Sequence, residues 1–212
     1  MSTINEKSYR AAFSGKEEEA LKQVLDIRKF EIDLYWKSSA YFWAFNAAAF
    51  AGYAAQASSA QAPDLLVMIA SFGLVLSFAW YLVNRGSKQW QQNWEHHVDM
   101  LEDCVTGPLY KIVIKQLKPH DIKGYFKYYI TGPGRFSVSK INMIVSLFAV
   151  ALWICLIFRA IPPLALKAAL SYISPLVAVA AIALMASVGR TSEEDNEGEA
   201  KRRSTSLGGE NI

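Results

Sequence analysis

The side chains best suited to chemistry gather in one short segment: Glu95, His96, His97, Asp99, Glu102 and Asp103. Imidazole and carboxylate groups are zinc ligands, and His96 can share a helical face with Asp99 or Asp103. The order differs from the HExxH motif of zinc proteases, in which two His at i and i+4 bind the metal and the Glu acts as base. We therefore favour a solvated helical face with interhelix ion pairs over a metal site, and predict no enzyme activity and no cofactor.

A second segment mixes basic and aromatic residues: Lys123, Tyr125, Phe126, Lys127, Tyr128, Tyr129 and Arg135. In single-strand nucleic-acid binders, such residues stack on bases and neutralise phosphate. Before a membrane span, the same mixture anchors a chain at the level of the lipid headgroups. Because a long apolar run follows, and because 22 basic against 19 acidic residues leave a net charge of only +3, we favour the lipid bilayer as the partner and do not expect nucleic acid.

The elements that position these segments are set by the separation of charged from apolar residues. Although 52% of the 212 residues are hydrophobic, the charged residues lie almost wholly outside four apolar runs, residues 38–57, 65–84, 141–161 and 164–189. Each run is near the roughly 20 residues that a helix needs to cross the hydrocarbon of a bilayer. A lone strand would leave its backbone groups unpaired in lipid, so helix is required. We predict an all-α, four-span transmembrane protein with cytoplasmic helical extensions.

The basic residues predict the orientation. Seven Lys or Arg precede the first run and nine lie between residues 85 and 140, whereas residues 58–64 have none. By the positive-inside rule, both termini are cytoplasmic. The chain then divides into a cytoplasmic amphipathic helix (1–37), a transmembrane hairpin (38–84), a cytoplasmic middle segment (85–140), a second hairpin (141–189) and a disordered cytoplasmic tail (190–212).

Several residues are candidates for packing. Ala44, Ala48 and Gly52 recur every four residues in the first run, a spacing that lets helix backbones approach closely. Trp90 and Trp94 begin an apolar stripe on the helix that continues from the second run, and such a stripe needs a partner. We expect this helix to pack with the N-terminal helix, which continues into the first run. Both features favour a homo-oligomer.

Asn46 is the polar residue near the middle of the first run. Its amide can hydrogen-bond a neighbouring helix or line a pore, and the residues alone leave both alternatives open. The two cysteines, Cys104 and Cys155, lie in different environments, so we expect no disulfide.

Three segments carry a resemblance to a known family: YWKSSAYFWAFNAAAFAGY (35–53), QWQQNWEHHVDMLEDCVTGPLYK (89–111) and FSVSKINMIVSLF (136–148). They resemble the RipA-like octameric membrane proteins of bacteria, over roughly residues 16–160. The resemblance implies an inner-membrane octamer with a role in adaptation or stress, and it supplies no catalytic residues. We therefore expect a non-enzymatic scaffold with an unknown cytoplasmic partner. The alternative is a pore-forming or membrane-perturbing effector, for example in phage defence.

Overall fold

The computed structural model describes residues 2–58, 63–114, 122, 128, 130–134, 136–162, 169–190 and 200–202. These residues fall into two compact units. The first takes its residues from Met1–Arg28, Asn93–Val113 and Ser192–Ile212, and the second from Lys29–Gln92 and Ile114–Thr191. Two long helices contribute to both units.

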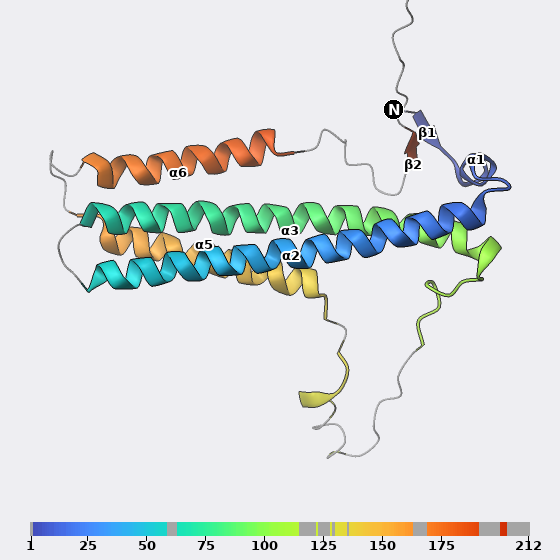
Figure 1. The fold of residues 1–212 in the computed structure, drawn as a ribbon, viewed down its shortest axis with the longest axis horizontal. Coiled ribbons are helices and arrows are strands. Elements are labelled where there is room, and N and C mark those ends of the chain that lie inside the picture. The colour runs from blue at the N-terminus through green and yellow to red at the C-terminus, as the bar shows by residue number, and fades with distance from the viewer. Residues whose placement is uncertain are drawn as a thin grey trace, which may run out of the picture. The chain divides into compact units, whose positions relative to one another are not determined.

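The described chain is helical apart from one pair of short strands (Figure 1). Its elements, in order, are β1 (Ser2–Ile4), α1 (Glu6–Ala12), α2 (Glu17–Ala57), α3 (Pro63–Val105), α5 (Val138–Ala160), α6 (Ala169–Val188) and β2 (Ala200–Arg202).

The N-terminal segment differs from the single helix predicted over residues 1–37. It contains two helices, because the chain turns between α1 and α2, where Gly15 has a φ of 76°, a conformation that glycine adopts without steric cost. The Asn5 side chain caps α1 by accepting a hydrogen bond from the Ser8 amide. After the turn, α2 continues unbroken into the first apolar run, because no Gly or Pro lies between residue 17 and the start of that run at residue 38.

The predicted disordered tail lies mostly outside the described residues. Where the structure describes it, at Ala200–Arg202, the chain forms strand β2 instead. This strand pairs antiparallel with β1, with Thr3 opposite Lys201.

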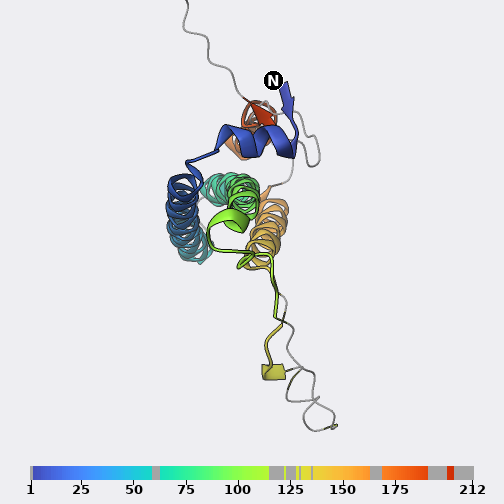
Figure 2. The same ribbon diagram turned by 90° about the vertical axis from the view of Figure 1, so that its right-hand side faces the viewer.

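The second unit is a bundle in which α2, α3 and α5 lie side by side (Figures 1 and 2). Helix α6 lies next to α3, on the side away from α2 and α5. Each bundle helix buries residues at alternating three- and four-residue spacing, which keeps one face toward its neighbours. On α5 this face comprises Ser139, Asn142, Ser146, Ala149, Trp153 and Ile157.

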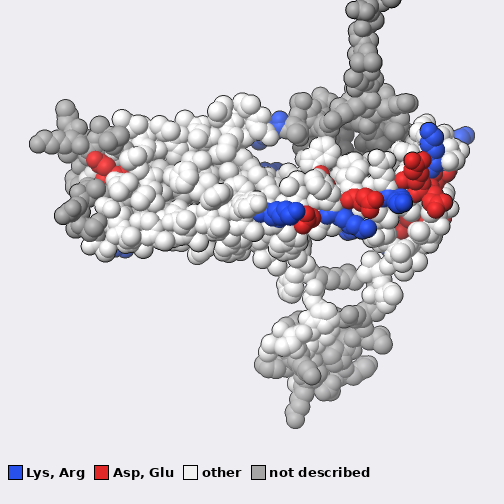
Figure 3. Space-filling view, in the orientation of Figure 1, with Lys and Arg blue, Asp and Glu red and all other residues white. Residues whose placement is uncertain are grey.

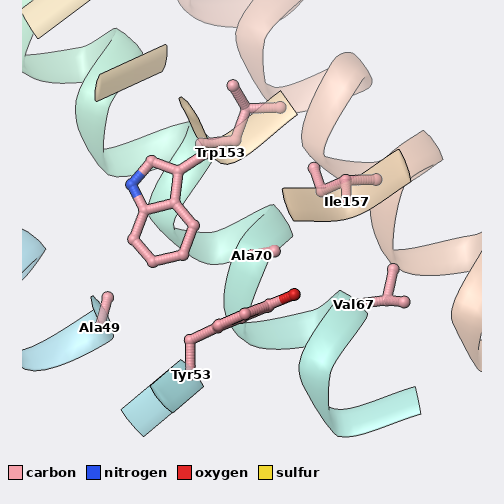
Figure 4. Close-up of a cluster of buried hydrophobic side chains, with 7 residues drawn as sticks. Ala49, Tyr53, Val67, Ala70, Trp153 and Ile157 are labelled. Atoms are coloured by element: carbon pink, nitrogen blue, oxygen red, sulfur yellow. The ribbon is translucent and has the colours of Figure 1, made fainter. Parts of the chain in front are cut away.

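The apolar core of this bundle surrounds Trp153 (Figure 4). The core residues are Ala49, Tyr53, Val67, Ala70, Leu74, Trp153 and Ile157. A Cβ at Gly73 would overlap the indole ring of Trp153. Glycine at this position of α3 is therefore what lets the large ring lie against the helix backbone.

Within the part of the chain that the structure describes, three helices are long and apolar enough to cross a membrane: Asp64–Val105, Val138–Ala160 and Ser171–Val188. They contain the second, third and fourth predicted spans. Helix α2 is not among them, because alanine and polar side chains supply much of its apolar run. Figure 3 shows blue and red side chains along the N-terminal part of α2, whereas the surface over its C-terminal part is white.

Candidate functional site

Asn46 is the centre of a polar cluster that joins three helices of the second unit. The Ser77 hydroxyl on α3 donates to Asn46 Oδ1 at 2.7 Å, and Trp153 Nε1 on α5 donates to the same oxygen at 3.0 Å. Asn46 Nδ2 donates to the Phe42 carbonyl at 3.0 Å. With only 4% of its surface exposed, Asn46 lies inside the bundle of its own subunit, and its hydrogen bonds fix the register of α2, α3 and α5.

A second polar cluster lies further toward the N-terminal ends of α2 and α5. Asn142 Nδ2 donates to the Tyr35 hydroxyl at 2.7 Å and to Ser39 Oγ at 3.4 Å. Asn84 and Ser146 are also buried within the bundle. Buried polar residues therefore gather at this end of the bundle, whereas the apolar core cluster surrounds Trp153.

A groove of about 340 Å³ lies between α2 and α5. Its walls are apolar, and the lining side chains include Trp43 and Phe50 on α2, Phe148 and Leu152 on α5, and Trp80 on α3. The volume is at the low end of the range typical of ligand sites, about 300–1,000 Å³. Asn46 also contributes to the lining, so the polar cluster lies directly beneath this apolar groove.

The small residues proposed for close packing lie on the exposed surface of α2. Ala44, Ala48 and Gly52 are exposed on α2, and the nearest atom to a Cβ built on Gly52 is Ile69 Cδ1 at 4.0 Å. The buried face of α2 instead carries Asn46 and its neighbours.

In the first unit, the predicted packing of the two amphipathic helical extensions is confirmed. Leu21 and Val24 of α2 pack with Val98 and Leu101 of α3, and Tyr9 of α1 completes the buried cluster.

Trp94 and Trp90, the two tryptophans proposed for assembly, differ in environment. Trp94 packs against the buried cluster of the first unit, and its ring lies 5.6 Å from that of His97. Trp90 belongs to the second unit, where 36% of its surface is exposed.

Four of the side chains that could bind metal, Glu95, His97, Glu102 and Asp103, have protein partners in the first unit. Glu95 pairs with Arg28 at 3.5 Å, and Asp103 pairs with Lys111 at 2.6 Å. Among the residues that the structure describes, no three His, Cys, Asp or Glu side chains are grouped as a metal site.

Glu102 is fully buried and fixes the chain that follows α3. Its carboxylate accepts hydrogen bonds from the Tyr110 amide at 2.7 Å and from the Lys111 amide at 3.2 Å. A buried carboxylate requires such donors. The chain leaves the helix at Gly107, whose φ is 74°, and residues 109–111 form a turn.

The contact between Tyr9 and His97 holds α1 against α3. The Tyr9 hydroxyl lies 2.6 Å from His97 Nδ1. Burial raises the pKa of Tyr9 to about 12. Burial, and to a lesser extent the neighbouring charge of His96, lowers the pKa of His97 below its usual value, so that the neutral imidazole is favoured.

Arg10 adds an ion pair to the same contact, with its Nη2 atom 3.3 Å from Asp103. Hydrogen bonding from Lys111 is the main cause that lowers the pKa of Asp103, and Arg10 adds to it.

Most of the basic and aromatic segment at residues 123–135 lies outside the described residues.

The sequence did not predict three contacts that are central to the structure: Gly73 against Trp153, Trp153 with Asn46, and Tyr9 with His97. For the first contact, the sequence offers one local signal, a glycine that interrupts an apolar run at residue 73. The other two contacts join residues far apart in the chain.

Comparison with known proteins gives a family. The model of the octameric membrane protein family (8xMP) matches residues 18–162, which include all of α3 and α5 and nearly all of α2. No curated protein and no solved structure matches the chain. Since the match covers more than half of the chain and confirms the resemblance seen in its sequence, the protein belongs to the octameric membrane protein family.

Proposed function

We propose that this protein is a non-enzymatic, homo-octameric scaffold of the bacterial inner membrane that presents a cytoplasmic surface to a partner. Family membership and the apolar helices make it a self-associating, multi-pass membrane protein. The eight-subunit stoichiometry follows the family description. The observation that carries the scaffold role is the ordered first unit, in which α1 and the ends of α2 and α3 are fixed by a buried cluster and by ion pairs.

We propose four spans, with α2 as the first. Its apolar part lies alongside α3 and α5 and is hydrogen-bonded to both through Asn46. The Tyr53 hydroxyl also donates to the Leu156 carbonyl on α5 at 3.4 Å. Such contacts compensate for the modest hydropathy of α2, because its polar groups are satisfied inside the bundle. Four spans, with the basic segments inside, place both termini in the cytoplasm.

The docking surface in this proposal is the segment that follows α3. Leu109, Ile112 and Val113 are 69%, 64% and 70% exposed. Contiguous exposed apolar side chains are typical of interaction sites, and Glu102 holds this segment in a defined position. We propose that an apolar surface of a cytoplasmic partner packs here.

Particle mass and symmetry in lipid nanodiscs test the assembly, and ion flux in liposomes tests the scaffold role against a pore. We expect eight subunits per particle and tight liposomes. A monomer would contradict the assembly. Ion flux through the wild-type protein would replace the scaffold with a pore-forming effector.

A photo-crosslinking amino acid at Ile112 tests the docking surface in cells. We expect one discrete adduct, abolished by Leu109→Asp, and no adduct from the same probe at Glu18, which is exposed on α2. Identical adduct patterns from both positions would contradict a docking surface at residues 109–113.

A further inference from the structure

We propose that the outward face of α5 in one subunit packs against the outward face of α2 in the next, so that a bulky surface meets a small-residue surface. This inference rests on the proposed self-association and specifies the surface that produces it. The two faces belong to different helices, so the contact is heterologous and can be repeated around a closed ring.

The extent of the family match locates the interface. The family model ends at residue 162, before α6 begins at Ala169. Among the described helices, α2, α3 and α5 are therefore the ones that can carry a self-association surface shared by the family. Helix α6 lies against α3, away from α2 and α5 (Figure 2). The faces of α2 and α5 that point away from the bundle core remain as the candidate surfaces.

Between residues 44 and 55, the outward face of α2 carries mostly alanine and glycine. Ala44, Ala48, Ala51, Gly52 and Ala55 are all exposed there, with Phe45 as the large residue among them. Alanine and glycine allow the backbone of a second helix to approach closely, which is how helices associate in lipid.

The outward face of α5 has the opposite character. Ile144, Leu147, Cys155 and Phe158 follow one another at helical spacing on the side opposite the buried residues. Ile144 is 66% exposed, Leu147 is 43% exposed and Phe158 is 75% exposed. These side chains form a ridge that can fill the space above the small-residue face of α2.

The hydrogen bonds inside one subunit give the register between the two faces. Trp153 donates to Asn46, so these residues lie at the same level of the bundle. Helices α2 and α5 run in the same direction (Figure 1), and Cys155 and Ala48 each lie two residues further on. A rotation axis along the membrane normal preserves depth, so Cys155 of one subunit is level with Ala48 of the next.

Oxidative cross-linking of the full chain in membranes tests this register. With Cys104→Ser as background, we introduce Ala48→Cys and oxidise with copper phenanthroline, leaving Cys155 as the only other thiol. A disulfide requires Cα atoms about 4.4–6.8 Å apart. We expect a covalent ladder of up to eight subunits, because every subunit carries one thiol on each face.

Two controls give the ladder its meaning. Adding Cys155→Ser abolishes it, and a dimer that persists in that variant would indicate a symmetric α2–α2 contact and overturn the proposal. Leu184→Cys on α6, 62% exposed, gives no ladder with Cys155. A ladder from Leu184→Cys equal to that from Ala48→Cys would also overturn the proposal, because it would indicate random collision.

A bulky substitution provides a second test. A Cβ at Gly52 meets its own subunit only at an ordinary van der Waals distance, 4.0 Å from Ile69 Cδ1, so the start of the Gly52→Leu side chain does not clash there. We expect it to convert octamers to smaller species while each subunit stays folded, whereas the matched Gly86→Leu, with no atom within 4 Å, keeps the octamer.

These outcomes separate the interface from the proposed function. Octamers by mass with no ladder and no effect of Gly52→Leu would refute the α2–α5 interface and leave the scaffold intact. A wild-type monomer in nanodiscs would refute both.

Discussion

Trp153 and Asn46 lie 107 residues apart in the chain, yet the indole Nε1 of Trp153 donates to Asn46 Oδ1 at 3.0 Å inside the second unit. The same oxygen accepts from Ser77. One amide therefore joins three helices, and its loss would leave two buried donors without an acceptor.

Asn46→Leu tests the structural role of this amide. An unsatisfied buried donor lowers the free energy of unfolding by about 1–3 kcal/mol. Interhelix hydrogen bonds in membranes contribute about 0.6 kcal/mol on average. We expect a lower melting temperature in detergent, with liposome flux unchanged. Increased flux in a folded Asn46→Leu octamer would assign the residue to a gate instead.

Gly73→Ala tests the close approach of Trp153 to α3. The added Cβ would overlap the indole ring, and overpacking of this kind costs about 1–3 kcal/mol. We expect loss of thermal stability, whereas Gly86→Ala, which meets no atom within 4 Å, should have a much smaller effect. Equal stability of the two variants in thermal unfolding would show that the bundle relaxes around the ring.

The Tyr9–His97 contact predicts a pH dependence. Because burial lowers the pKa of His97 below 6.5 in the folded state, the unfolded chain binds the proton first as the pH falls. The stability of the first unit should therefore be fully present above pH 6.5 and should fall with acidification toward the lowered pKa. Histidine NMR titration checks the pKa, and hydrogen exchange of α1 and α3 amides checks the stability.

Tyr9→Phe keeps the ring but removes the hydroxyl, and it should increase hydrogen exchange of the α1 amides at neutral pH. A His97 pKa of 6.5 or above in the intact protein would contradict the buried contact.

Glu102→Ala should release the segment that follows α3. The carboxylate accepts from the amides of Tyr110 and Lys111, and the loss of its two acceptor oxygens should destabilise this turn by about 1–3 kcal/mol. We expect faster hydrogen exchange at these two amides and weaker cross-linking from the probe at Ile112. Asp99→Ala is the control on the same helix, and an equal effect there would argue against a specific role for Glu102.

The sequence by itself determined the helical class, the separation of apolar spans from charged ends, and the membership in the family. These features depend on local properties, because a run of about twenty apolar residues requires a membrane helix whatever its neighbours are. It also predicted that α2 and α3 continue beyond their apolar runs and pack together. It did not predict the separate helix α1 or the pairing of Thr3 with Lys201, since a short helix and a pairing between distant strands depend on contacts outside the local pattern.

Only the tertiary structure decided how the candidate residues are used. Periodicity placed Asn46 and Ala48 on the same helix, but it could not say which of them faces the core. The positions of α3 and α5 bury Asn46 against Ser77 and Trp153 and leave Ala48 on the surface. This choice depends on three helices meeting in one register, which the hydrogen bonds to a single amide fix and no local stretch of sequence contains.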